Sequence, residues 1–446
     1  MVRVRAAPLV VASTAQLMLV LDVSVVNVAM PALQSELRMS GAGVQWVATA
    51  YALVFAGGLL VGGRLADVRG VRATLCGGLA VFVVASAIAG LAGSGAVLVA
   101  ARAIQGVGAA VASPATLTVL TRTYAEGPER TTAIAVWTAV SLVGGAAGNI
   151  IGGALTDLLS WRAIFLVNVP IGILVIAVAR HVLDDTTHTP TRIDVVGAVL
   201  ITITLCACTL AVAQADGGSV VVASGAAALA LVAAGSAAAQ QRRSSAPLIP
   251  KSLWRNRTVV FANFLTLVTG MCFQAPIWLF LTYVMQTSMG MSALAAGIGF
   301  VPMAATMMVV GTMCAPRAME RVSASSLVAF GALVAAAGFC WLAAVSASGG
   351  YLTAVLGPSL VIGVGAGVVN TPLTTLTTQG VAPDDSGAAS GMMNTAKQFG
   401  GALGLAALTP LTAGYSDFTV GFTTMAAAMV VVAATSVLYT VNGTSR

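Results

Sequence analysis

A single carboxylate lies deep inside an apolar stretch of this 446-residue chain. Asp22 interrupts a run that extends from about residue 6 to residue 31. A charged side chain in lipid costs about 2.5–3.5 kcal/mol on insertion scales, and such residues usually mark ion or proton pathways. Asp22 is therefore a candidate proton carrier that faces a water-filled path. A hydrogen bond that only packs two helices together is the alternative.

Arg102, in a second apolar run, is the natural partner for Asp22. At 1.5 Å per residue, Asp22 lies about 13 Å and Arg102 about 8 Å from the outer ends of their runs. Their side chains can cover the difference, so the sequence predicts an ion pair if the two runs form neighbouring helices. Gln105 shares the helix face of Arg102 at i+3. The alternative is that Arg102 extends to the outer interface.

Lys397 is the other cation within an apolar run, and it is too deep to reach the interface easily. Two interpretations stay open. Lys397 neutralises part of a substrate, or it pairs with a carboxylate that the sequence does not identify. The C-terminal half has no second deep carboxylate, so a substrate with two positive charges is disfavoured.

Glycines follow a helical spacing in a further apolar run. Gly144, Gly148 and Gly152 recur every four residues, with Gly153 beside the last. This spacing puts small residues on one helix face and predicts a tight seam with another helix. A static seam and a seam that slides during a transport cycle both stay open.

A short basic segment, residues 63–72, contains Gly63, Asp67, Gly70 and Arg72. We expect a tight cytoplasmic turn here, because glycine permits a sharp reversal of the chain. Asp67 is an acid among arginines. It would cap the following helix or pair with an arginine across a moving interface.

The elements that carry these residues are membrane-spanning helices. The chain is 58% hydrophobic and only 8% charged, with a mean hydropathy of +0.96, whereas soluble domains are about 25% charged. Uninterrupted apolar runs exclude an outer-membrane barrel, whose strands alternate apolar and polar residues. At about 20 residues per span, the charged residues divide the chain into fourteen predicted spans. These spans cover residues 6–31, 43–63, 73–91, 97–120, 133–155, 163–181, 195–214, 219–240, 258–284, 294–315, 325–345, 351–376, 388–411 and 419–440.

The basic residues orient these spans. With both termini in the cytoplasm, only Arg38 and Arg162 fall in outside loops and only Arg102 and Lys397 fall within spans. All other Lys and Arg residues then lie on the cytoplasmic side, which is the usual asymmetry of membrane proteins. The net charge of +7 is thus a signal of topology, and it does not indicate nucleic-acid binding.

Several enzyme and cofactor classes lack their signatures. The chain has only two lysines and neither follows a glycine, so there is no Walker A loop. Its six cysteines and two histidines show no zinc-ligand spacing. We therefore expect no enzymatic activity, no cofactor and no metal, and we expect an ion gradient as the source of energy.

The two halves of the chain contain similar segments about 255 residues apart. Residues 128–133 resemble residues 383–388, and residues 106–114 resemble residues 365–372. Two six-span halves separated by an extra pair of spans would give this offset, and parallel repeats are a transporter architecture. Coincidence among runs rich in Gly and Pro is the alternative.

Together, these segments resemble the major facilitator superfamily, in its fourteen-span drug:proton antiporter branch. Residues 21–31 and 161–172 resemble two signatures of that branch. Residues 63–72 resemble the G-x-L-a-D-r-x-G-r-r motif, and residues 102–108 resemble the R-x-x-Q-G-x-G motif. The glycines of the fifth span resemble the antiporter motif G-x-x-x-G-P-x-x-G-G, although Asn149 replaces its proline. That departure predicts a weaker kink in the fifth span.

The resemblance implies an all-α integral membrane protein with the major facilitator fold. Two six-helix bundles, residues 1–184 and 255–446, would flank two inserted helices in residues 185–254. The implied protein is a monomer in the lipid bilayer of the plasma membrane, and it exports small amphipathic compounds in exchange for protons. A proton-coupled importer is the alternative. A membrane-embedded enzyme or receptor is a further rival, but no loop is long enough for a catalytic domain.

The resemblance also implies roles for single residues. Asp22 and Arg102 would couple the proton to transport, and residues 63–72 would form a conformational switch. The residues that would line the substrate path are Asn27, Gln105 and Lys397.

Overall fold

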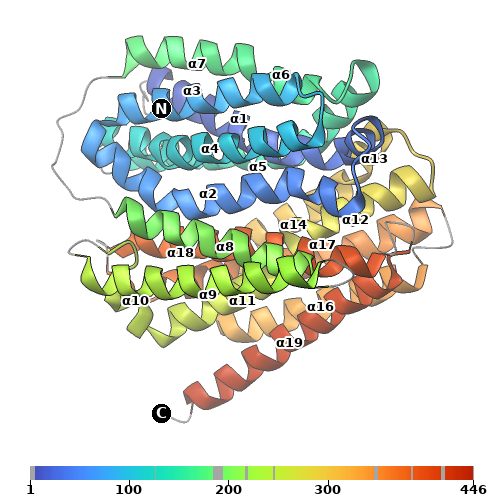
Figure 1. Ribbon diagram of the computed structural model, residues 1–446. Helices are drawn as coiled ribbons and strands as arrows, with labels where there is room; N and C mark the ends of the chain where they lie inside the picture. Colours follow the sequence, from blue (N-terminus) through green and yellow to red (C-terminus); the bar gives the residue numbers. More distant parts are fainter. Residues whose placement is uncertain are drawn as a thin grey trace. The chain divides into compact units, whose positions relative to one another are not determined.

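The computed structural model describes residues 6–125, 127–183, 194–215, 219–244, 247–345, 350–382, 385–412 and 417–444. All regular secondary structure in these residues is helical. The chain divides into two compact units. The first unit is Met1–Ala211 with Ser224–Leu248, and the second is Val212–Ala223 with Ile249–Arg446. Figure 1 shows the long helices of each unit running alongside one another.

Helices α1 to α7 form the body of the first unit. Their bounds are α1 Ala6–Glu36, α2 Gly41–Arg69, α3 Val71–Gly90, α4 Gly95–Thr123, α5 Pro128–Leu158, α6 Ala163–Leu166 and α7 Asn168–Val182. Helix α4 packs against both α2 and α3, and α1 packs against α5. Most of α8 (Val195–Ala213) and of α9 (Val220–Arg243) groups with this unit.

The second unit contains longer helices that are broken by short segments. Their bounds are α10 Lys251–Arg255, α11 Arg257–Phe273, α12 Pro276–Tyr283, α13 Ala293–Gly299, α14 Val301–Val309, α15 Ala315–Met319, α16 Ala324–Val345, α17 Gly357–Thr378, α18 Ser386–Leu408 and α19 Thr419–Thr444. Three π-helical segments and one 3-10 segment join them, at η1 Val284–Ser288, η2 Val310–Cys314, η3 Leu352–Leu356 and η5 Thr409–Thr412. Helix α16 packs against α17 and α19, and α11 packs against α18.

The two units repeat the same helix pairings. In the first unit α4 packs on α2 and α3, and in the second α17 packs on α14 and α16. A Cβ on Gly108 of α4 would meet the Gly78 carbonyl oxygen at 2.7 Å, and a Cβ on Gly365 of α17 would meet the Gly331 carbonyl oxygen at 2.7 Å. Such close approaches require glycine. This equivalence supports the repeat that the sequence suggested over coincidence.

Side-chain caps fix several helix starts. Ser40 accepts a hydrogen bond from the backbone N–H of Gly43 at 3.0 Å, and Ser94 accepts one from Val97 at 3.4 Å. In the second unit, Asn256 caps α11. Short polar residues at this position satisfy backbone N–H groups that the first turn of a helix leaves free.

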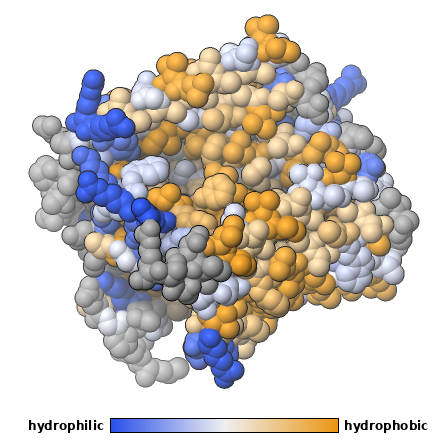
Figure 2. Space-filling view, turned by 90° about the horizontal axis from the view of Figure 1, so that it is seen from below, coloured by the Kyte–Doolittle hydropathy of each residue, from blue (hydrophilic) through white to orange (hydrophobic). Residues whose placement is uncertain are grey.

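Length and apolar surface make this a multi-pass membrane protein. Within the described residues, eleven helices are long and apolar enough to cross a membrane, or twelve if the two bent parts of α5 form one span. Many large apolar side chains are exposed, including Val220, Val221 and Leu231. On the face shown in Figure 2, apolar residues cover most of the surface, and the strongly hydrophilic ones gather near its edges. Such a surface suits lipid rather than water.

The sequence predicted fourteen spans, and helices occupy all fourteen ranges. Two of them fall short as spans: the apolar part of α2 is the shorter stretch Gly43–Leu59, and α18 is not among the eleven helices within the described residues. The predicted span 258–284 lies within one candidate span, Arg257–Ser288. Inside it, α11 ends at Phe273 and α12 begins with Pro276, which lacks the N–H that would continue α11. The division of the chain at residues 184 and 254 stays a prediction.

Helix α5 is bent by 42° between Thr132–Gly145 and Ala147–Leu158. The sequence predicted a weaker kink because Asn149 replaces the proline of the antiporter motif. The bend is present without that proline. It follows the pair Gly144 and Gly145, and adjacent glycines are a recognised cause of helix kinks.

Candidate functional site

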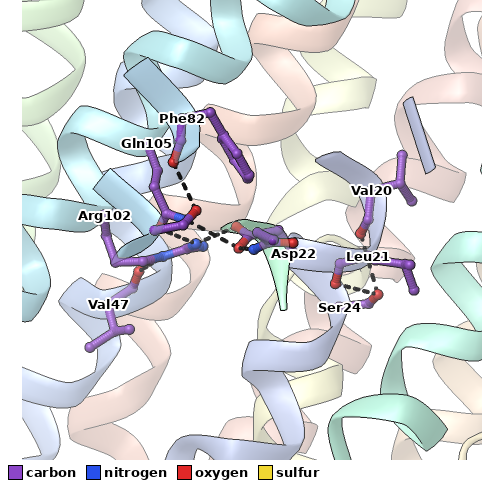
Figure 3. Close-up of polar contacts among 10 residues, drawn as sticks. Val20, Leu21, Asp22, Ser24, Val47, Phe82, Arg102 and Gln105 are labelled. Carbon is purple, nitrogen blue, oxygen red and sulfur yellow. Dashed lines mark hydrogen bonds and ion pairs between the residues drawn. The ribbon is translucent and has the colours of Figure 1, made fainter. Parts of the chain in front are cut away.

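Asp22 lies at the centre of a buried polar network in the first unit (Figure 3). Its side chain projects from the middle of α1, and the residue is 1% exposed. One carboxylate oxygen, Oδ2, forms an ion pair with Nη1 of Arg102 from α4. The other, Oδ1, accepts hydrogen bonds from Nε2 of Gln105 at 3.2 Å and from Nδ2 of Asn168, in α7, at 2.8 Å. Three helices therefore converge on one carboxylate.

The guanidinium of Arg102 contacts groups from several helices, and the residue is also 1% exposed. Its Nε donates to the backbone carbonyl of Val47 in α2 at 2.9 Å, and its Nη1 donates to Oε1 of Gln105 at 2.9 Å. The rings of Tyr51 and Phe165 lie 4.4 Å and 5.7 Å from its central carbon. A cation over an aromatic face is stabilised further. The position of Arg102 is thus fixed by α2 and α6 as well as by Asp22.

Gln105 connects the ion pair to α3. Its Nε2 donates to Oγ of Ser86 at 2.7 Å, and that hydroxyl donates to the carbonyl oxygen of Phe82 at 2.8 Å. The oxygen of this side-chain amide therefore accepts from Arg102, and its nitrogen donates to Asp22 and Ser86. Every member of the network is satisfied, which is the condition under which buried polar groups stabilise a fold.

The arrangement can act as a charge switch. A buried ion pair is stabilising only while both charges are present, and removal of one leaves the other uncompensated in a medium of low dielectric constant. Addition of a proton to Asp22 would have this effect on Arg102. Protonation would therefore weaken the contact between α1 and α4, whose side chains form the pair.

The structure brings Asp22 and Arg102 together, as the sequence predicted. In this conformation the network and the surrounding helices enclose Asp22. Arg102 is buried against α2, and this excludes the alternative that it extends to the outer interface. Gln105 is fully buried and donates to Asp22, and its role on the substrate path stays a prediction.

Asn168, Ser86 and Tyr51 are site residues that sequence reasoning missed. Asn168 stands in the segment 161–172 that resembles a branch signature, but its spacing gave no partner. An amide inside an apolar run was the available signal, since a buried amide needs hydrogen-bond partners. Its partner could be identified only once the packing of α7 near α1 was known.

The remaining substrate-path candidates lie outside this network. Asn27 is half-buried in α1 and forms no hydrogen bond with another described residue. It follows Asp22 by five residues, so it points about 140° away around the helix. Lys397 belongs to α18 of the second unit, where it is half-buried.

The predicted turn over residues 63–72 is shorter than expected. Helix α2 continues to Arg69, and only Gly70 separates it from α3. Gly70 has φ 83° and ψ 151°, a backbone conformation that favours glycine. Nη1 of Arg72 donates to the carbonyl oxygens of Arg180 at 3.5 Å and Leu183 at 3.4 Å, at the end of α7. Positive charge at a helix C-terminus is favourable.

Two other members of that motif add little to the site. Gly63 lies within α2, where a Cβ would sit 3.9 Å from Cβ of Pro114. The side chain of Asp67 is outside the part of the chain that the structure describes.

The glycines of α5 form a tight seam with α1. A Cβ on Gly148 would lie 1.8 Å from Oγ of Ser24, and one on Gly152 would lie 2.6 Å from the carbonyl oxygen of Val25. A Cβ on Gly144 would lie 2.7 Å from Cδ1 of Leu17. The seam therefore presses on the turn of α1 that also carries Asp22.

Two neighbours complete the seam. Gly153 is buried. Asn149 is 1% exposed, and its Oδ1 has no hydrogen-bond partner among the described residues. An orphaned buried oxygen is unfavourable, so Asn149 is a weak point in an otherwise close-packed contact.

Known proteins are similar to this chain along most of its sequence. The family model described as Major Facilitator Superfamily matches residues 12–405. The cephamycin export protein CmcT of Amycolatopsis lactamdurans is 45% identical over 91% of this chain and 84% of its own length. The puromycin resistance protein pur8 of Streptomyces alboniger is 36% identical over 91% of this chain and 81% of its own.

A third relative is more distant. The tetracenomycin C resistance and export protein of Streptomyces glaucescens is 31% identical over 89% of this chain and 74% of its own length. Likeness of this extent, together with the family match and the helical fold, makes the chain a transporter rather than an enzyme, and it belongs to the major facilitator superfamily.

Proposed function

We propose that this protein exports small amphipathic compounds, such as antibiotics or secondary metabolites, in exchange for protons. The names of the relatives support export: they include an export protein for cephamycin, a resistance protein for puromycin, and a resistance and export protein for tetracenomycin C. The observation that carries the proton coupling is the buried ion pair of Asp22 and Arg102. The carboxylate of Asp22 is a titratable group, and its protonation would change the net charge inside the helix bundle.

In the cycle that we propose, Asp22 takes a proton from the outside and the substrate is released there. Neutral Asp22 no longer balances the positive charge of Arg102, so the conformation that contains the ion pair is no longer favoured by it. A ligand or proton shifts a two-state equilibrium only by its difference in affinity for the two states. The protein then reorients, and Asp22 returns its proton to the cytoplasm when a new substrate binds.

The proposed topology has fourteen spans with both termini in the cytoplasm of a monomeric plasma-membrane protein. The long apolar helices, with α2 and α18 added, would supply the spans. Helices α8 and α9 would be the inserted pair between two six-span bundles. The asymmetry of the basic residues supports this orientation, because Arg38 and Arg162 would be the only Lys or Arg residues in the outside loops.

The importer is the rival within transport, and it predicts that protons and substrate move together. The glycine seam of α5 supports export through its resemblance to the antiporter motif, although Asn149 departs from that motif. Drug accumulation in an efflux-deficient host separates the two. Expression should lower accumulation, and a protonophore should restore it. Higher accumulation on expression would show import.

The coupling residue is tested in reconstituted vesicles with an imposed pH gradient. Asp22→Asn keeps the shape and two amide contacts but cannot take a proton, so substrate-induced proton movement should disappear. Asp22→Glu should keep part of it. Proton exchange at the wild-type rate in the Asp22→Asn protein would exclude Asp22 as the carrier.

A further inference from the structure

Lys397 is a cation in the middle of a membrane helix that the described structure leaves without a counter-charge. It lies eleven residues from each end of α18, which spans Ser386–Leu408, or about 16 Å from either end at 1.5 Å per residue. Its ammonium group forms no ion pair and no hydrogen bond with another described residue. An unpaired ammonium at this depth is unfavourable, so such a residue is a functional-site hypothesis by default.

Within the described part of the second unit, no acid lies at the depth of Lys397. After residue 249 the only carboxylates are Glu320, Asp384, Asp385 and Asp417. Of these, the described residues Glu320, Asp385 and Asp417 lie beyond the end of a helix rather than inside one. The nearest along the chain precedes α18 by one residue, about 18 Å from Lys397. Asp22, the one deep carboxylate, is already bound by Arg102, Gln105 and Asn168.

The face of α18 that carries Lys397 is polar, and its part before Lys397 is exposed. Ser390 and Asn394 precede it by seven and three residues, so the three side chains share one side of the helix, and both neighbours are exposed. The adjacent helix α11 packs closely on α18 at this point, because a Cβ on Gly270 would meet the Lys397 carbonyl oxygen at 2.7 Å. A polar stripe of this kind is unsuited to lipid contact.

A further amide pair borders this stripe. Nε2 of Gln274, just beyond the end of α11, donates to Oε1 of Gln398 at 3.2 Å. The region thus combines one free positive charge with several hydrogen-bonding groups and the apolar surface of α11. We infer that Lys397 binds the carboxylate of the exported compound, and that the substrates of this transporter are amphipathic organic anions. This inference rests on the proposed export function.

The chemistry of the two cations supports this assignment. Arg102 has an internal carboxylate partner and therefore has no charge to offer a substrate. Lys397 has none, so a substrate carboxylate would complete a charge-assisted hydrogen bond, the stronger class of hydrogen bond. A cationic substrate would instead meet repulsion at this point.

Transport into inverted membrane vesicles tests the inference. The probes are nalidixic acid and benzylpenicillin, the neutral methyl ester of each, and ethidium as a cation. Lys397→Met removes the charge at similar length, and Lys397→Arg keeps it. Lys251→Met alters the other lysine, which is exposed before α11, and serves as the matched control.

We expect Lys397→Met to raise the half-saturating concentration of the acids about tenfold or more and to leave the esters unchanged. Lys397→Arg should transport the acids, and Lys251→Met should match the wild type. Equal transport of the acids by Lys397→Met, or loss of acids and esters together, would overturn the inference.

The wild-type results separate this inference from the proposed function. Transport of ethidium or of the esters but of neither acid would leave export standing and overturn the anion site. Transport of none of the probes by the wild type would count against the export function itself, and the anion site would fall with it.

Discussion

The ion pair between Asp22 and Arg102 makes a quantitative prediction about stability. Asp22→Asn leaves a buried guanidinium without its counter-charge, and Arg102→Met leaves a buried carboxylate. Breaking a buried pair from one side typically destabilises a protein by about 3–5 kcal/mol, whereas replacing both partners with neutral groups is far less harmful. The double variant should therefore be more stable than the sum of the single effects predicts.

The contacts in the structure refine these magnitudes. In Asp22→Asn, Arg102 keeps the Val47 carbonyl at 2.9 Å and the Tyr51 ring at 4.4 Å, so the loss should lie near about 3 kcal/mol. In Arg102→Met, only the amides of Gln105 and Asn168 remain to stabilise the carboxylate. The loss should then approach about 5 kcal/mol, and the double variant, which leaves no charge unpaired, should lose less than either single variant.

Unfolding of the four purified proteins in the same detergent measures these differences. The Arg102→Met protein should regain stability as the pH falls, because a proton neutralises its lone carboxylate. The Asp22→Asn protein has no such group in the network and should not. Additive single effects, or the same pH dependence in both single variants, would contradict a buried ion pair in the membrane protein.

Three further outcomes follow from the packing and the topology. Gly148→Leu should abolish transport while the protein still reaches the membrane, because even a Cβ at this position would overlap α1. Gly77→Leu is the control, since a Cβ there meets nothing within 4 Å. Wild-type transport by Gly148→Leu would show that the seam is not closely packed. Asn168→Ala should remove about 1.5–3 kcal/mol of stabilisation from the carboxylate and shift the pH profile of substrate exchange, whereas an unchanged profile would make Asn168 irrelevant to coupling. A cysteine introduced at Ser244 should react with an impermeant thiol reagent only after the cells are opened, and labelling in intact cells would reverse the proposed topology.

The positions of the membrane helices could be predicted from the sequence because lipid imposes one simple demand. A run of about 20 apolar residues has to be helical to satisfy its own backbone. Breaks within the runs were harder to predict, since Pro276 ends a helix while Pro31 and Pro114 lie inside helices that continue. A neighbouring helix or side chain decides whether the freed backbone group is satisfied.

The candidate site was only partly predictable. Depth along two helices was enough to bring Asp22 and Arg102 together, because depth depends only on residue number. The contribution of Asn168 depends on which helices are neighbours, and no spacing within one helix contains that information. The enclosure of Asp22 depends on the conformation as well, because alternating access exposes a site in some states and buries it in others.

Asp22 and Lys397 together suggest how export would draw on the whole proton-motive force. If Asp22 returns one proton inward for each monoanion that Lys397 releases outward, two positive charges move inward in every cycle. Each charge gains about 2.3 kcal/mol per 100 mV, so one cycle would gain about 4.6 kcal/mol per 100 mV of membrane potential. Exchange of a proton for a monovalent cation would move no net charge and would gain nothing from that potential. A lysine without an internal partner is thus an energetic advantage for an exporter of anions, because it lets the membrane potential expel the substrate as well as draw in the proton.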